Sequence, residues 1–123
     1  MNAEKKPLLR DQQRALHAYD AVGKVPKTQH EDYEIAVNSL GANILRSGLC
    51  AAIAAVQRRG ERGSLLLDHL ASAGVPGLEG VTANDLAKRV RELDADAYMV
   101  ATREMLKVAV WLKRAVQATS GGA

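Results

Sequence analysis

The sequence is poor in aromatic residues and in cysteine, and each shortage excludes a class of structure. It has no phenylalanine, one tryptophan and three tyrosines, so it lacks the aromatic platform on which an RRM-type sheet stacks RNA bases. The single cysteine, Cys50, excludes an internal disulfide and a cysteine-based zinc site. Cys50 lies in the small apolar segment LCAAIAAV, and we expect a core residue there rather than a reactive thiol.

Long hydrophobic runs are also missing. No apolar segment reaches the roughly 20 residues that a membrane-spanning helix needs. Residues 1–10, MNAEKKPLLR, lack the apolar centre of a secretory signal peptide. We therefore expect a cytoplasmic protein that does not associate with a membrane.

Motifs of known enzyme classes are absent. The segment HEDYE at 30–34 begins like a zinc-protease helix but lacks the second histidine at the required spacing. The adjacent Asp68 and His69 diverge on a helix and form no catalytic pair by themselves. The three histidines, His17, His30 and His69, fall on separate predicted helices. The sequence thus predicts no enzyme, no metal site and no cofactor.

Helical periodicity dominates what is present, and valine, isoleucine and aromatic residues are too sparse for a sheet. At 123 residues, one domain spanning 1–123 is the natural size. We predict an all-α, compact single-domain bundle of about six helices, with a flexible tail from about residue 119. The predicted helices are 7–22, 30–47, 49–59, 64–73, about 82–93, and 96–118.

Three local features refine this prediction. The first helix is expected to bury Leu8, Ala15, Leu16, Tyr19 and Val22. Ser64 is expected to cap the fourth helix, and Gly48 to end the second. Gly41 lies inside the second helix, where it indicates a kink or a close contact with a neighbouring helix.

Basic residues are unevenly distributed along the chain. The formal net charge is +3, and residues 41–66 account for all of it, with four arginines against Glu61 alone. Such clustering favours an anionic partner. Cations near helix C-termini also complement the helix dipole, and both interpretations remain open. The four arginines are Arg46, Arg58, Arg59 and Arg62.

The segment 96–118 has the clearest two-sided pattern. At about 100° per residue, its apolar positions form one broad face. Arg103, Lys107 and Arg114 fall opposite that face, within about 40° of each other, and Trp111 lies beside them. Trp111 is interpreted as a core or interface anchor in preference to a base-stacking residue. A second apolar strip on the helix indicates enclosure by the bundle or contact with another protein; its members are Met99, Leu106 and Val110.

Three blocks of sequence carry a resemblance to a known family. They are ATREML at 101–106 followed by WLKR at 111–114, LGANILRSGLCAAIA at 40–54, and the weaker RALHAY at 14–19. In this order they resemble the small subunit of type III-B CRISPR effector complexes, the Cmr small subunit, over most of the chain.

The resemblance implies a non-catalytic backbone subunit of a ribonucleoprotein. Copies of such a subunit stack into a filament beside other subunits of the complex, and their basic faces hold the guide–target RNA. RNA cleavage in that family belongs to the neighbouring backbone subunit. Recognition of sequence is then left to guide–target pairing, so the chain needs only phosphate contacts. The candidate nucleic-acid-binding residues are Arg103, Lys107, Lys113, Arg114, Arg46, Arg58, Arg59 and Arg62.

Two alternatives from other classes remain. Gly48 between two predicted helices resembles the spacing of a helix-turn-helix DNA-binding regulator, although the following helix has few polar groups to contact base edges. A protein-only adaptor, whose arginines contact acidic partners, is the other.

Overall fold

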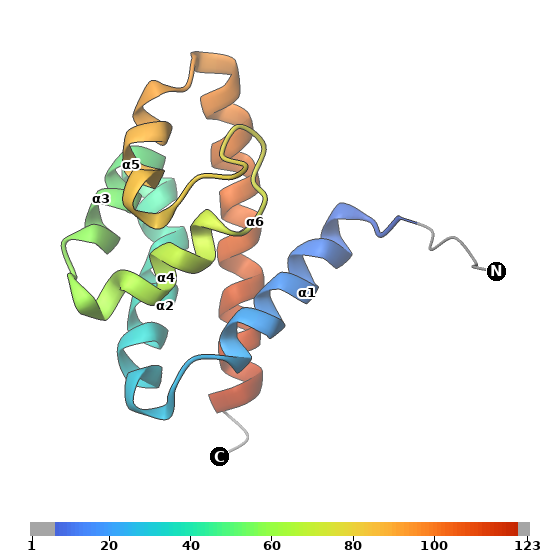
Figure 1. The fold of residues 1–123 in the computed structure, drawn as a ribbon, viewed down its shortest axis with the longest axis vertical. Coiled ribbons are helices and arrows are strands. Elements are labelled where there is room, and N and C mark those ends of the chain that lie inside the picture. Colours follow the sequence, from blue (N-terminus) through green and yellow to red (C-terminus); the bar gives the residue numbers. More distant parts are fainter. Residues whose placement is uncertain (1–6, 121–123) are drawn as a thin grey trace.

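The computed structural model describes residues 7–120, and within that range it contains six α-helices, one short 3₁₀ turn and no strand. This arrangement confirms the predicted all-α fold class (Figure 1). The 3₁₀ turn, η1, covers Lys27–Gln29. The α-helices are α1 (Arg10–Gly23), α2 (His30–Ser47), α3 (Leu49–Gln57), α4 (Glu61–Ala71), α5 (Ala83–Glu92) and α6 (Ala95–Ser120).

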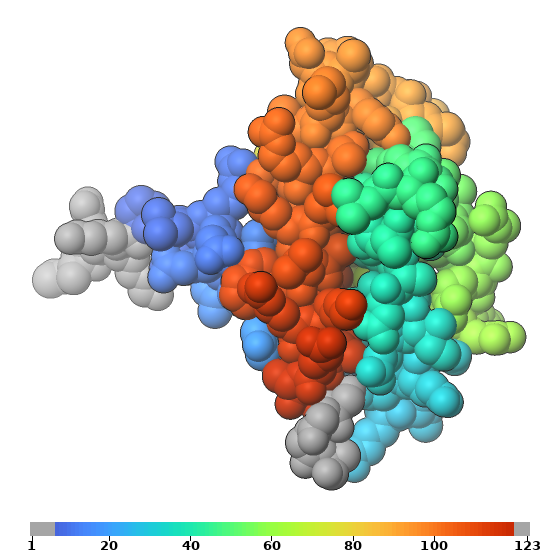
Figure 2. All heavy atoms as spheres, turned by 180° about the vertical axis from the view of Figure 1, so that it is seen from behind, coloured from blue at the N-terminus to red at the C-terminus, as the bar shows by residue number. Residues whose placement is uncertain are grey.

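Helix α6, with 26 residues, is the longest element and runs the length of the molecule. Helix α1 packs along one side of it and α2 along the other (Figures 1 and 2). Helices α3 and α4 pack against α2, and α5 packs against α3 and α4. The face of α6 that the sequence predicts as apolar is buried, with Met105 and Leu112 completely inaccessible to solvent. One hydrophobic core therefore joins all six helices.

Helix α1 contacts the bundle through a different face from the one predicted. Leu8, Leu16 and Tyr19 are exposed, whereas Arg14 and Ala18 are buried. The alanines of α1 allow its backbone to approach α6 closely, and Arg14 finds a buried partner there. The prediction was wrong for Leu8, Leu16 and Tyr19 for that reason, and it is confirmed for Val22, which is buried. The helix starts at Arg10 and leaves Pro7 outside.

Helix α4 begins earlier than predicted. It starts at Glu61, directly after Gly60, and Ser64 lies inside it with its hydroxyl donating to the Glu61 carbonyl oxygen. Ser64 is therefore not a cap. The φ of Gly60 is 62°, a conformation that favours glycine and reverses the chain between α3 and α4.

The remaining helix ends lie within two residues of the predicted ones. Gly48 ends α2 as predicted, with its N–H donating to the Ile44 carbonyl oxygen. Cys50 is half-buried against the core. Helix α6 continues to Ser120, past the predicted end at 118, and the rest of the predicted tail, 121–123, lies outside the described residues. None of the described helices is long and apolar enough to cross a membrane.

Candidate nucleic-acid interface

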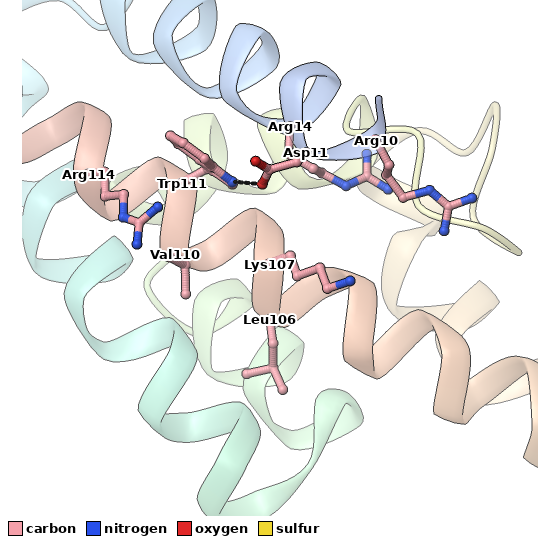
Figure 3. A pocket seen from close by; sticks show the side chains of 8 residues that line it. All are labelled: Arg10, Asp11, Arg14, Leu106, Lys107, Val110, Trp111 and Arg114. Atoms are coloured by element: carbon pink, nitrogen blue, oxygen red, sulfur yellow. Dashed lines mark hydrogen bonds between the residues drawn. The ribbon is translucent and has the colours of Figure 1, made fainter. Parts of the chain in front are cut away.

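A groove of about 320 Å³ separates the N-terminal half of α1 from the C-terminal half of α6 (Figure 3). Four cationic side chains line it, together with two apolar side chains of α6. Among the described residues that line it, one has a carboxylate, which is bonded to the tryptophan of the groove. The lining residues are Arg10, Asp11, Arg14, Leu106, Lys107, Val110, Trp111 and Arg114.

Trp111 joins the two helices of the groove. Its Nε1–H donates to Oδ1 of Asp11 at 3.1 Å, and its half-buried ring packs against the core. The Arg114 guanidinium lies 4.8 Å from the ring centroid, within the range of a cation–π interaction. Trp111 is therefore an anchor of the α1–α6 interface, and Arg114 is held at the rim of the groove.

The carboxylate of Glu104 organises three of the cations. It is 3.3 Å from both Arg10 and Arg14 and 3.5 Å from Lys107. Glu104 and Arg14 are buried, and Arg14 also donates through Nη1 to the carbonyl oxygen of Ala73. Arg10 and Lys107 remain largely exposed, so they neutralise Glu104 while their outer surfaces face solvent.

These contacts fix the charge of Glu104. Burial by itself raises the pKa of its carboxyl group, but Lys107, Arg14 and Arg10 together outweigh burial. The resulting pKa is below its ordinary value, and Glu104 is ionised at neutral pH. One buried negative charge is thus compensated by three positive ones, which leaves a net positive groove.

The predicted cations of α6 are all exposed, on the face between α1 and α2. Arg103, Lys107, Lys113 and Arg114 each point away from the core. Arg103 forms no ion pair within residues 7–120, and it borders a second, shallow concavity with Tyr98, Met99, Thr102 and Leu106. The second apolar strip is partly exposed beside these cations, and Leu106 is common to both concavities.

The arginines of residues 41–66 do not join this face. Arg58, Arg59 and Arg62 gather at the turn between α3 and α4, at the edge of the molecule away from α1 and α6 (Figures 1 and 2). Arg46 is in the last turn of α2, on a different element from both groups, and it does not line the α1–α6 groove. The eight candidate residues therefore occupy three separate places.

Comparison with known proteins assigns this helical chain to a family. A family model described as CRISPR-associated protein (Cas_Cmr5) matches residues 10–119. The chain belongs to the Cmr5 family. That family supplies a small subunit of the type III-B Cmr complex, and the resemblance that the sequence blocks carry is confirmed.

A solved Cmr5 structure has the same fold. It is the crystal structure of a CRISPR-associated Cmr5 family protein from Thermus thermophilus, 32% identical to this chain. The two superpose with a TM-score of 0.77, over 90% of this chain and 97% of the other. No curated protein sequence matches this Cmr5 chain significantly.

Several groove residues were not among the predicted candidates of this Cmr5 chain. Arg10, Asp11 and Arg14 were not singled out, because the leucines of the first helix indicated a different buried face. Glu104 adjoins the buried arc of α6 and precedes Lys107 by three residues, a spacing that permits an ion pair. That spacing, and the i, i+4 spacing of Arg10 and Arg14, are the features of the sequence that could have indicated these groove residues.

Two of the three histidines come together outside the groove. His17 Nε2 is 3.2 Å from the Ser72 hydroxyl, and His69 Nδ1 is 2.6 Å from the Tyr33 hydroxyl. Burial is the main cause that lowers the pKa of both imidazoles. No cluster of three potential metal ligands occurs among residues 7–120. The imidazoles thus connect α1, α2 and α4 through hydrogen bonds.

Proposed function

We propose that this Cmr5 chain is a non-catalytic backbone subunit that holds target RNA along the guide through the exposed face of α6 and the α1–α6 groove. The single observation that carries the proposal is the row Arg103, Lys107 and Arg114, exposed on one face and joined by Arg10 across the groove. A row of cations follows a phosphate backbone without reading bases. Such contacts suit a subunit that leaves sequence recognition to base pairing.

The apolar strip beside the cations supports contacts with protein. Met99 and Val110 are exposed, with 62% and 47% of their surface accessible, and Leu106 lies between them. Exposed apolar side chains in a row are typical of protein interfaces. Other subunits of the complex, or further copies of this chain in a filament, are the proposed partners of this strip.

The groove favours binding over catalysis. The Asp11 carboxylate is bonded to Trp111, and the other charged side chains that line the groove are cations. Catalysis of cleavage would need a nucleophile or general base positioned against the phosphodiester group, and Asp11 is instead oriented by the Trp111 N–H and has no histidine or second carboxylate beside it among the described residues that line the groove. We therefore assign RNA cleavage to a neighbouring subunit.

The helix-turn-helix alternative is disfavoured by α3. The helix that follows Gly48 would have to place polar side chains into the major groove of DNA. In this chain Leu49, Ile53 and Val56 of α3 are buried, and Gln57 is its one long polar side chain. The protein-only adaptor makes a different experimental prediction, because its affinity for RNA would be negligible.

The test compares charge reversals in a reconstituted complex. Arg103→Glu is the cleanest variant, since Arg103 has no ion pair within the described chain. We expect weaker target RNA binding and a smaller salt dependence, by about 0.7 in the log–log slope for each phosphate that the variant no longer binds. Lys88→Glu on α5 changes the charge equally, on an exposed position away from the groove, and is the control. Equal effects of the two variants would contradict the proposal.

Reversal at the other two positions needs separate interpretation. Lys107→Glu places a second carboxylate beside the buried Glu104, and Arg114→Glu removes the cation above Trp111. Both variants are expected to lower the free energy of unfolding as well as RNA affinity. The free protein should bind RNA weakly, with a slope of roughly −2 to −3.5 for three to five contacts. Fluorescence of Trp111, the only tryptophan, reports directly on the groove.

A further inference from the structure

The α3–α4 turn forms a second cationic concavity, separate from the α6 face. A hollow of about 250 Å³ is lined by three residues alone, Arg58, Arg59 and Arg62. Arg58 ends α3, and Arg62 belongs to the first turn of α4. Three guanidinium groups therefore surround one small space with no carboxylate in its lining.

Two glycines build this turn. Gly60 has a φ of 62° and a ψ of −131°, which residues with a side chain rarely adopt. At Gly63, a Cβ atom would lie 2.4 Å from the Val56 carbonyl oxygen. Only glycine lets α4 begin this close to the end of α3. The resulting tight junction brings together arginines that are one and four positions apart in the sequence.

The helix dipole explains only part of this cluster. Arg58, at the C-terminal end of α3, is stabilised by the partial negative charge there. Arg62 is in the opposite situation, because the N-terminal turn of α4 has a partial positive charge that disfavours a cation. Within residues 7–120, moreover, none of the three arginines forms an ion pair.

One donor in the cluster has no acceptor. Nε of Arg59 is inaccessible to solvent and has no hydrogen-bond partner in the described chain. A buried donor without a partner costs free energy, and most such groups in folded proteins are satisfied. Guanidinium donors match the oxygens of phosphate in a bidentate geometry. An anionic oxygen in the hollow would relieve the mutual repulsion of the cations, and a small shift of the Arg59 side chain would bring its buried Nε–H to this acceptor.

We propose that the α3–α4 turn binds a phosphate group, independently of the RNA face on α6. The phosphate comes either from the backbone of a nucleic acid or from free inorganic phosphate. Because the turn lies at the edge away from α1 and α6, this phosphate is not part of the strand along Arg103 and Lys107. The site adds to the proposed function and does not depend on it.

The test follows the Arg59 Nε–H signal of the full chain by NMR during titration with inorganic phosphate and, separately, with a uridine oligonucleotide. Saturable movement of this signal by either probe is expected. Arg62→Gln should weaken the binding by about tenfold or more, as expected when hydrogen bonds to a charged group are removed. Lys88→Gln removes an exposed positive charge of α5 outside the hollow and should have no effect on the binding.

The two probes distinguish the sources. If the Arg59 signal moves at a lower concentration of the oligonucleotide than of phosphate, and added phosphate reverses the movement, the natural ligand is a nucleic-acid backbone. Saturation by phosphate alone identifies the free ion. Since Arg62 is exposed, Arg62→Gln should fold normally. Arg58→Gln, at the other exposed arginine of the hollow, provides a second variant that keeps the Arg59 signal, and its fold is checked by circular dichroism. Unchanged Arg59 signals with both probes, equal binding by Arg62→Gln, or binding of an acidic peptide alone would overturn the proposal.

Discussion

Glu104 on α6 and Arg14 on α1 form a buried ion pair across the α1–α6 interface, with 3.3 Å between Oε1 and Nη2. Both side chains are 5% exposed, and 90 residues of sequence separate them. The pair attaches the first helix to the last and places Arg10 and Lys107 beside the groove. A structural ion pair therefore also positions two of the cations proposed to contact RNA.

Replacing Glu104 by glutamine should lower the free energy of unfolding by about 3–5 kcal/mol, because it leaves the Arg14 charge buried without a counter-ion. Chemical denaturation measures the loss. The double variant Arg14→Met, Glu104→Met should recover most of it, since apolar side chains of similar size can replace a buried pair. Arg10→Met removes an exposed partner and should cost less than about 1 kcal/mol. Similar losses for Arg10→Met and Glu104→Gln would contradict this account.

Substitutions of Trp111 should separate its hydrogen bond from its packing. Trp111→Phe removes the bond to Asp11 and keeps an aromatic ring, at an expected cost of about 0.5–1.5 kcal/mol. Trp111→Ala should cost about 2–3 kcal/mol, less than a fully buried tryptophan, because the ring is half-buried. Urea denaturation followed by circular dichroism measures both. A negligible cost for Trp111→Ala would show that the ring is not an anchor.

Two glycines should respond to alanine in opposite directions. A Cβ at Gly41 would lie 3.9 Å from that of Ala109, an ordinary contact, so Gly41→Ala should stabilise the protein by about 0.5–1 kcal/mol. Gly63→Ala meets the Val56 carbonyl oxygen and should destabilise it by about 1–3 kcal/mol. Thermal unfolding compares the two variants directly. A change of the unfolding temperature with the same sign in both would contradict the described surroundings of the two glycines.

Acid should weaken the contact between α1 and α4. The pKa values of His17 and His69 are below the ordinary 6.5, mainly because of burial. As the pH falls below 6.5, the unfolded chain takes up protons that the folded imidazoles resist, so the free energy of unfolding decreases. Arg14 and Lys24 add to this resistance, and the carboxylates of Asp20 and Asp68 oppose it.

The measurement is the free energy of unfolding between about pH 7.5 and 5, which brackets the histidine range. His17→Gln combined with His69→Asn should flatten this dependence. If the free energy of unfolding of the double variant still depends on pH in this range, other titratable groups are responsible.

Much of the fold could be predicted because α6 and α2 are long and strongly periodic. The buried face of α6 follows from its apolar spacing, and the exposure of Arg103, Lys107 and Arg114 follows with it. Gly48 and the end of α2 were equally visible in the sequence. These features depend on the local sequence pattern, so the sequence of each helix by itself is enough to predict them.

The groove could not be predicted in the same way. Leu16 and Tyr19 suggested the wrong face of α1, because the buried face is decided by partners on α6 that are distant in sequence. Likewise, glycines at 60 and 63 indicate a break in the helix, but Gly63 lies inside α4. Glycine is required there because a side chain would collide with the Val56 carbonyl oxygen. Such contacts depend on tertiary packing, which periodicity does not contain.

The contacts of the groove have a consequence for the order in which the protein matures. Arg14 bonds to Glu104, and Asp11 bonds to Trp111 across 100 residues of sequence. During synthesis, α1 is therefore completed long before α6. The α1–α6 contact can form only after nearly the whole chain has been synthesised. A nascent or truncated chain that lacks α6 cannot form the groove, so the surface proposed to bind RNA exists only once α6 has been synthesised.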